Sequence, residues 1–261
     1  ASSPPPTDEA LAEFLSSCRL DPAAPLPTLE TPLHAALPFR WVLHTHDLPT
    51  LALTDTTKKD AIAREVWGEK LAYTGYVRPG LPLAKTMLSL EGFQNRQGLV
   101  LGKHGLVVWG DTCKEAYDTL HRLIGEAEEY IRKMQAVKRP LAKLRHPAVD
   151  ATRRRAAADA LLPALRGLLG RPRPVVLHLD DSEEARRFAD SELAKQIHRR
   201  GMATPEHILR CGRTPCYVDA PLASLPREEA LSRLRQSVEL FESDTRQSFQ
   251  KHGRGGDPAH P

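Results

Sequence analysis

The chain has 261 residues, of which 41% are hydrophobic, and a formal net charge of +4 from 37 basic and 33 acidic side chains. This length and composition allow a hydrophobic core and one large domain with an appendage. The charge is too small to indicate a nucleic-acid-binding protein, no apolar run reaches the roughly 20 residues of a membrane-spanning helix, and the first residues lack the pattern of a signal peptide. We therefore expect a cytoplasmic protein that binds neither nucleic acid nor membrane, with its four cysteines reduced.

The hydrophobic pattern of the first 140 residues alternates between helix and strand. Apolar side chains at steps of three and four indicate helices, and short runs rich in Val, Leu and aromatic residues indicate strands. The strongest signal is a helix that begins at the capping box of Thr112 and Glu115 and continues until Pro140. In chain order we expect helices over 8–18 and 28–37, a strand over 39–46, a helix over 57–71, a strand over 72–80, two short strands over 97–111 and then the long helix.

After Pro140 the composition becomes basic and rich in Ala and Leu, which indicates a helical linker over 141–170. The patterns beyond it predict a small α/β appendage over 171–261, and residues 1–140 form the main domain. In chain order the appendage is expected to contain a strand over 174–181, a helix over 182–201, a helix over 204–212 and a helix over 227–251.

Two histidines stand one residue apart at the end of the first predicted strand, in the sequence WVLHTH. Side chains two residues apart on a strand point to the same face with α-carbons about 6.5 Å apart, so His44 and His46 could bind one metal ion. A catalytic zinc ion takes three protein ligands. His104 is the best third ligand, because Gly102 and Gly105 flank it in a turn whose backbone can approach the end of another strand. A His-x-His pair is also typical of a half-exposed strand end, and the spacing alone leaves both interpretations open.

Glu30 lies near the start of the second predicted helix, one turn ahead of His34. The helix dipole stabilises an ionised carboxylate there, so Glu30 could be an ordinary helix-end residue. It could also act as a general base beside a metal-bound substrate, with partial burial raising its pKa towards the working range. His34 is expected to be a packed or hydrogen-bonded neighbour and not a ligand.

The segments LETPLHAALPFRWVLHTH, GYVRPG and GLVLGKHGLVVWGDTCKEAY resemble the class II aldolase/adducin family, most closely the aldolase part of bifunctional rhamnulose-1-phosphate aldolase/alcohol dehydrogenase proteins. The resemblance covers residues 15–139 and continues more loosely beyond them. It implies a three-layer α/β/α fold around a mostly antiparallel sheet whose N-terminal strands are missing here. It also implies a zinc-dependent aldehyde-lyase in which His44, His46 and His104 hold one zinc ion per subunit.

The resemblance implies roles for three further residues. Glu30 takes and returns the proton at the carbon that becomes the nucleophile, Tyr76 in GYVRPG donates a proton to the aldehyde oxygen, and Thr28 keeps a hydroxyl at a phosphate-binding position. The implied reaction, in carbohydrate metabolism and specifically rhamnose catabolism, is retro-aldol cleavage of a ketose 1-phosphate, with L-rhamnulose 1-phosphate giving dihydroxyacetone phosphate and L-lactaldehyde as the best match.

The chemistry of this reaction suits zinc and predicts how the activity depends on pH. The ion stabilises the charge of the enediolate as a Lewis acid. Because its ligands must be neutral imidazoles, activity should fall below about pH 6. Relatives form homo-tetramers with sites at subunit borders, so we expect a homo-oligomer in which Tyr76 acts in a neighbouring subunit's site.

Two features of the family pattern are absent. Relatives carry a Ser-Gly-Asn-x-Ser phosphate-binding segment well before the catalytic glutamate, and the 29 residues ahead of Glu30 contain none, which predicts either a fragment or a reduced relative. No Gly-x-Gly-x-x-Gly occurs, so the dehydrogenase activity of the fused relatives is not expected. The alternatives are a sugar-phosphate epimerase or dehydratase of the same fold, and a non-catalytic adducin-like interaction module.

Overall fold

The computed structural model describes residues 7–138, 141, 143–170 and 173–252, and it divides into two compact units. The first unit extends to Met134 and includes residues 203–205, and the remaining described residues belong to the second. No described helix is long and apolar enough to span a membrane.

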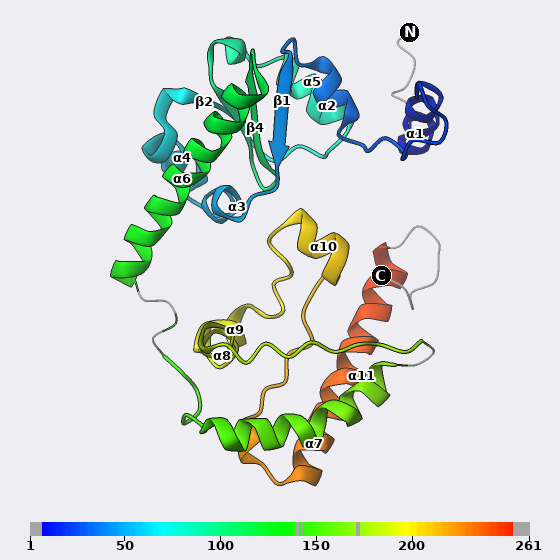
Figure 1. Cartoon of the computed structure of the whole chain (residues 1–261), viewed down its shortest axis with the longest axis vertical. Helices are drawn as coiled ribbons and strands as arrows, with labels where there is room; N and C mark the ends of the chain where they lie inside the picture. Colours follow the sequence, from blue (N-terminus) through cyan, green and yellow to red (C-terminus); the bar gives the residue numbers. More distant parts are fainter. Residues whose placement is uncertain (1–6, 139–140, 142, 171–172, 253–261) are drawn as a thin grey trace. The chain divides into compact units, whose positions relative to one another are not determined.

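A four-stranded sheet forms the centre of the first unit (Figure 1). Its order is β1 (Trp41–Thr45), β4 (Gly105–Gly110), β3 (Gly98–Leu101) and β2 (Leu71–Thr74). The pairs β1–β4 and β3–β4 are antiparallel, whereas β2–β3 is parallel. The α/β class and the mostly antiparallel sheet are therefore confirmed.

Helices cover both faces of this sheet, because strand side chains alternate between two hydrophobic clusters (Figure 1). In β4, for example, Leu106 and Val108 join one cluster, while Val107 and Trp109 join the other. The first face is covered by α3 (Leu48–Thr54), α4 (Lys59–Trp67) and α6 (Cys113–Lys138), and the second by α2 (Thr31–Ala36) and α5 (Leu81–Leu88). The layers are therefore helix, sheet and helix.

The long helix α6 begins as its sequence predicts. The Thr112 hydroxyl accepts a hydrogen bond from the Glu115 amide at 3.1 Å, and the Glu115 carboxylate accepts one from the Asp111 amide at 2.9 Å. Leu123 is fully buried, and the indole of Trp67 donates a 3.0 Å hydrogen bond to the Leu123 carbonyl. This contact fixes α4 against α6.

Several elements of the first unit differ from their predicted bounds. The first helix is α1 (Asp8–Ser17), the helix expected over 57–71 ends at Trp67, and the strand expected over 72–80 is only β2. Helices α3 and α5 were not predicted at all. Both have proline in the first turn, where its missing amide costs no hydrogen bond, so these two Leu-Pro segments are helix starts.

The regular elements among the described residues of the second unit are helices, and the strand expected over 174–181 is wrong. That segment has no hydrogen-bonded partner strand, and the one β-bridge recorded among the described residues of this unit joins Leu144 to Ser191. The helix expected over 182–201 is divided, because the buried Ser191 hydroxyl accepts a hydrogen bond from the Ala194 amide and starts a new helix. The elements are α7 (Ala151–Leu169), α8 (Glu183–Ala189), α9 (Glu192–Ile197), α10 (Pro205–Cys211) and α11 (Arg227–His252).

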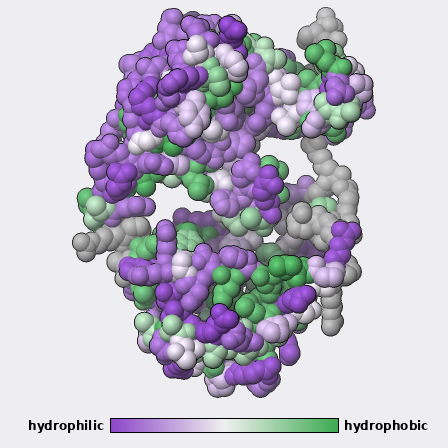
Figure 2. Space-filling view, viewed as in Figure 1, coloured by the Kyte–Doolittle hydropathy of each residue, from purple (hydrophilic) through white to green (hydrophobic). Residues whose placement is uncertain are grey.

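The core of the second unit is small. The segment expected to be a linker contains α7, whose Leu161 packs with Ala230 and Leu231 of α11. Hydrophobic groups remain at the surface of this unit (Figure 2), among them Val176, which is 96% exposed.

Candidate metal centre

Four predicted site residues meet at one edge of the sheet. His44 lies in β1, His46 follows its last residue, and His104 lies in the turn that joins β3 to β4. Glu30 directly precedes α2. Within the described residues, the ligand atoms of these four side chains all lie within 4.8 Å of one another, and they are the group of His, Cys, Asp and Glu residues that could hold a metal ion.

The side chains converge through their outer nitrogen atoms on one carboxylate oxygen. Glu30 Oε1 is 2.9 Å from His104 Nε2, 3.1 Å from His46 Nε2 and 3.9 Å from His44 Nε2. The Nε2 atoms of His46 and His104 are 3.0 Å apart, and each pair of the three imidazole rings has a centroid separation of 4.9 Å. The three rings thus form a triangle of equal centroid separations, and their Nε2 atoms all lie within 3.9 Å of the same Glu30 oxygen.

Gly105 lets the turn reach the end of β1. A β-carbon added at residue 105 would lie 1.9 Å from the carbonyl oxygen of Thr45, far inside any real contact. Antiparallel pairing continues up to this point, with Thr45 opposite Leu106. Only glycine permits this approach, which brings His104 beside His46 although 58 residues separate them.

Asp47, which was not among the predicted site residues, fixes the backbone just after His46. Asp47 accepts a hydrogen bond from the Thr45 hydroxyl at 3.0 Å and one from the Thr50 amide at 2.8 Å, and so caps α3. An aspartate followed two residues later by proline is a recognisable helix start, so this signal was present in the sequence.

Burial keeps His44 uncharged. Its side chain is 5% exposed, and desolvation lowers the pKa of its imidazole from 6.5 to about 3, against the opposing effect of the Glu30 charge. Neither ring nitrogen of His44 has a hydrogen-bond partner in the described part of the chain. Buried polar atoms without partners are rare in proteins, and a neutral imidazole with a free nitrogen is the form that binds a metal ion.

The pKa of Glu30 is lowered, not raised as expected. Hydrogen bonds with His104 and His46 are the largest causes, and together they outweigh desolvation, which alone would raise it. The carboxylate lies at the start of α2, as predicted, but makes no hydrogen bond to the amides of that helix. Its side chain is directed at the histidines.

The remaining predicted residues lie outside this cluster. Thr28 accepts a hydrogen bond from the Glu30 amide at 3.2 Å through its hydroxyl, so it shapes the turn before α2. The ring of His34 is 6.0 Å from that of His44, in keeping with a packed neighbour. Tyr76 is 60% exposed in the segment after β2, and its hydroxyl makes no hydrogen bond to the described residues.

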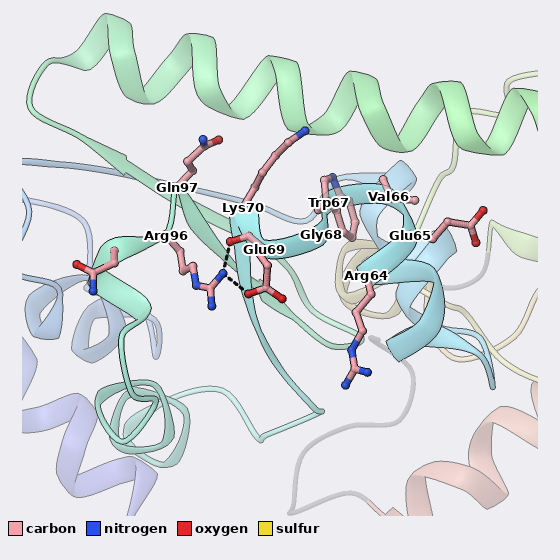
Figure 3. A pocket seen from close by; sticks show the side chains of 10 residues that line it. Arg64, Glu65, Val66, Trp67, Gly68, Glu69, Lys70, Arg96 and Gln97 are labelled. Atoms are coloured by element: carbon pink, nitrogen blue, oxygen red, sulfur yellow. Dashed lines mark hydrogen bonds and ion pairs between the residues drawn. The ribbon is translucent and has the colours of Figure 1, made fainter.

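A cavity of about 480 Å³ lies at the opposite edge of the sheet (Figure 3). It surrounds the beginning of β2, whereas the histidines lie beyond the end of β1. The guanidinium of Arg96 is paired there with Glu69 (Figure 3). This cavity is therefore separate from the Glu–His cluster, and it is lined by Arg64, Glu65, Val66, Trp67, Gly68, Glu69, Lys70, Asn95, Arg96 and Gln97.

Comparison with known proteins gives two family matches that together span most of the chain. Residues 8–131 match the class II aldolase and adducin N-terminal domain, and residues 156–260 match the class II aldolase second domain. The chain belongs to the class II aldolase and adducin family.

Two individual proteins are similar to this chain. The uncharacterized oxidoreductase YuxG of Bacillus subtilis (strain 168) is 29% identical over 253 residues, which are 96% of this chain and 36% of that protein. The chain thus spans about a third of its relative's length. The N-terminal class II aldolase domain of a conserved protein from Thermoplasma acidophilum is 38% identical, covering 48% of this chain and 58% of that one, with a TM-score of 0.44.

Proposed function

We propose that the first unit is a zinc-dependent class II aldolase that cleaves a ketose 1-phosphate, with L-rhamnulose 1-phosphate as the preferred candidate. The observation that carries the proposal is the convergence of three imidazole nitrogens and one carboxylate oxygen at the edge of the sheet. Family membership supports a lyase of this type.

The donor set fits a divalent transition-metal ion. Three imidazoles with an adjacent carboxylate suit zinc, and the free Nε2 of buried His44 supplies a donor that is otherwise unsatisfied. His44, His46 and His104 would hold the ion. A bound ion would supply Lewis-acid stabilisation for negative charge that develops on substrate oxygens.

Glu30 is proposed to move the proton at the carbon next to the carbonyl group. Its side chain is 27% exposed, so it adjoins both the histidines and solvent from which a substrate enters. The hydrogen bonds that lower its pKa come from His104 and His46. If the Nε2 atoms of His46 and His104 were bonded to an ion, they could not also bond to the carboxylate, and Glu30 would be free to act as a base.

Tyr76 is proposed to donate a proton to the aldehyde oxygen in the site of a neighbouring subunit. Its exposure and its free hydroxyl support a role at a subunit border. The assembly would be a homo-tetramer. Thr28 is proposed to contribute its hydroxyl to phosphate binding, in addition to its bond with the Glu30 amide.

The test separates metal binding from turnover. His44→Ala should reduce zinc from about one ion per chain to below about 0.2 and lower the melting temperature in zinc, because a ligand is lost. Glu30→Gln should retain zinc and lower kcat, because only the proton acceptor is lost. His121→Ala, which removes an exposed histidine of α6, is the matched control and should leave both unchanged. A Glu30→Gln variant with wild-type turnover would refute the role of Glu30.

The substrate assay discriminates the other activities of this fold. Rhamnulose 1-phosphate and ribulose 5-phosphate are offered separately to the zinc-loaded protein. Formation of dihydroxyacetone phosphate from the first supports the aldolase, and isomer formation from the second alone supports an epimerase. A protein that contains less than about 0.2 zinc per chain when zinc is supplied is an interaction module, and the enzymatic proposal fails.

A further inference from the structure

A second cavity lies within the second unit. Its volume is about 600 Å³, which falls in the range of small-molecule binding sites. The lining comes from the end of α9, from residues 217–220 and from α11, all of which belong to the described part of this unit. The cavity therefore shares no residue with the Glu–His cluster of the first unit, and a ligand bound in it would occupy a different site.

Helix α11 contributes a stripe of five residues to the cavity, and four of them are polar. Arg233, Gln236, Ser237, Leu240 and Ser243 recur at steps of three and four, so they lie on one face of the helix. The adjacent face carries the buried apolar residues of α11, as is usual where a helix packs on protein. The polar stripe therefore offers hydrogen-bonding groups to the cavity and not to the core.

Two aromatic rings also line the cavity. The rings of His198 and Tyr217 are stacked, with centroids 4.6 Å apart and planes inclined by 24°. Each ring is held in place by a hydrogen bond at its edge. The Tyr217 hydroxyl accepts one from the Arg145 guanidinium at 2.7 Å, and His198 Nδ1 donates one to the Lys195 carbonyl at 2.7 Å. This pair is a preformed aromatic surface on which a planar ring could stack.

The two carboxylates that line the cavity differ in their partners. Asp219 is paired with Arg145 and, at 3.1 Å, with Lys195, so its charge is already compensated. Glu239 makes no ion pair with the residues that the structure describes, and its side chain is exposed. A free carboxylate of this kind accepts hydrogen bonds from the hydroxyl groups of a sugar.

Two guanidinium groups at the cavity are available for an anion. Arg199, which follows α9, is exposed and forms no ion pair within the described part of the chain. Arg233 has Glu229 at 4.0 Å, one helical turn away, and its side chain is 56% exposed. Such surface pairs are weak, so this contact does not occupy the guanidinium. Arginine binds phosphate through paired, charge-assisted hydrogen bonds.

We propose that this cavity binds a nucleoside monophosphate. The aromatic pair of His198 and Tyr217 stacks with the base, Glu239 accepts hydrogen bonds from the ribose hydroxyls, and the two arginines bind the phosphate. The cavity thus supplies one matching group for each part of such a ligand, on elements of a single unit. The inference does not depend on the proposed aldolase reaction.

Equilibrium binding of AMP, adenosine and ribose 5-phosphate to the full chain tests the site part by part. The wild type should bind AMP at least about tenfold more tightly than either of the other two, because adenosine lacks the phosphate and ribose 5-phosphate lacks the base. Arg233→Gln should weaken AMP and ribose 5-phosphate about fivefold or more and leave adenosine unchanged. His198→Ala should weaken AMP and adenosine about fivefold or more and leave ribose 5-phosphate unchanged.

Matched variants separate binding from folding and from general attraction. Arg235→Gln removes an exposed arginine of α11 that does not line the cavity, and it should keep all three affinities. His198→Phe retains an aromatic ring and should restore the affinities for AMP and adenosine that His198→Ala loses. Damage to the fold would weaken all three probes together, and it would lower the melting temperature.

The results decide the proposal in either direction. It is overturned by a wild type that does not prefer AMP to both fragments, or by an Arg233→Gln variant that keeps the full preference for AMP over adenosine. Equal weakening by Arg235→Gln would mean attraction to a basic surface and would overturn it too. A sugar phosphate bound at the Glu–His cluster would not respond to Arg233→Gln, so loss of ribose 5-phosphate binding in this variant assigns the phosphate to this cavity.

Discussion

Replacing Gly105 with alanine should separate the two halves of the metal centre. The added β-carbon would lie 1.9 Å from the Thr45 carbonyl oxygen and 2.9 Å from the Thr45 carbonyl carbon. Both contacts are with backbone, so no side chain can move aside. Reaching even a tight 3.0 Å contact requires the turn and the end of β1 to move apart by about 1 Å.

A displacement of this size matters more for the metal than for the fold. Overpacking of this kind costs about 1–3 kcal/mol or somewhat more. Metal–ligand distances vary by only about 0.2 Å from their usual values. The displacement would move His104 away from His44 and His46. We therefore expect zinc affinity to fall at least about tenfold, together with a loss of several degrees in the melting temperature of the metal-free protein.

The assay is zinc titration followed by thermal melting with and without metal, and α6 offers the matched control. A β-carbon at Gly125 meets no atom within 4 Å, so Gly125→Ala should stabilise the helix by about 0.5–1 kcal/mol and leave zinc affinity unchanged. If Gly105→Ala binds zinc as tightly as the wild type, the turn does not control the site in the way the close approach to Thr45 indicates.

Two further predictions concern stability. The pKa of His44 is about 3 in the folded state and 6.5 ordinarily, so the unfolded chain binds a proton that the folded chain lacks between these values, and stability falls as pH drops from 6.5 towards 3. Between pH 7.5 and 5 the loss should be about 2 kcal/mol by urea unfolding of the metal-free protein, and His44→Gln should remove that part of the pH dependence. Trp67→Phe should cost about 1–3 kcal/mol in urea unfolding followed by circular dichroism, since it removes buried ring volume and the indole hydrogen bond to the Leu123 carbonyl, and a loss under about 0.5 kcal/mol would contradict that role.

Helices and strands of the first unit could be predicted where the spacing of apolar residues fitted only one type of element. The helix after Thr112 had both a cap and a long apolar stripe, and the strand that contains His44 had an apolar run of its own. Helix α3 was missed because its seven residues offer too little periodicity, although the start signal of Asp47 and Pro49 was present. Local patterns identify long elements better than short ones.

The second unit shows what local patterns cannot supply. The run of apolar residues around Val176 has strand-like composition, but a strand requires a partner to satisfy its backbone groups. The described residues of this unit provide no such edge, so the segment forms no strand. A strand is a property of two segments, and the sequence of one segment does not reveal the other.

The same distinction applies to the site. The spacing of His44 and His46 indicated a shared face, and the glycines beside His104 indicated a close turn, but only the β1–β4 register brings these two segments together. The direction of the Glu30 pKa shift depends on contacts with His104 and His46 that no local pattern contains. The sequence therefore identified which residues form the site, but it did not give the direction in which their contacts shift the pKa of Glu30.

The histidines and Glu30 are positioned by different backbone elements, and this explains why metal binding and turnover should be separable by mutation. The histidines are fixed by paired strands and by a backbone contact at Gly105, which is a rigid arrangement. Glu30 instead precedes a six-residue helix that has no side-chain cap, and α2 is held mainly by the burial of Leu33 against the α5 side of the sheet. Truncating Leu33 would therefore shift the carboxylate relative to the three imidazoles while leaving their triangle in place. A general base must lie within hydrogen-bond reach of the proton it takes. The packing beneath α2 should therefore determine the rate of proton transfer, whereas the pairing of the strands should determine the affinity for the metal ion.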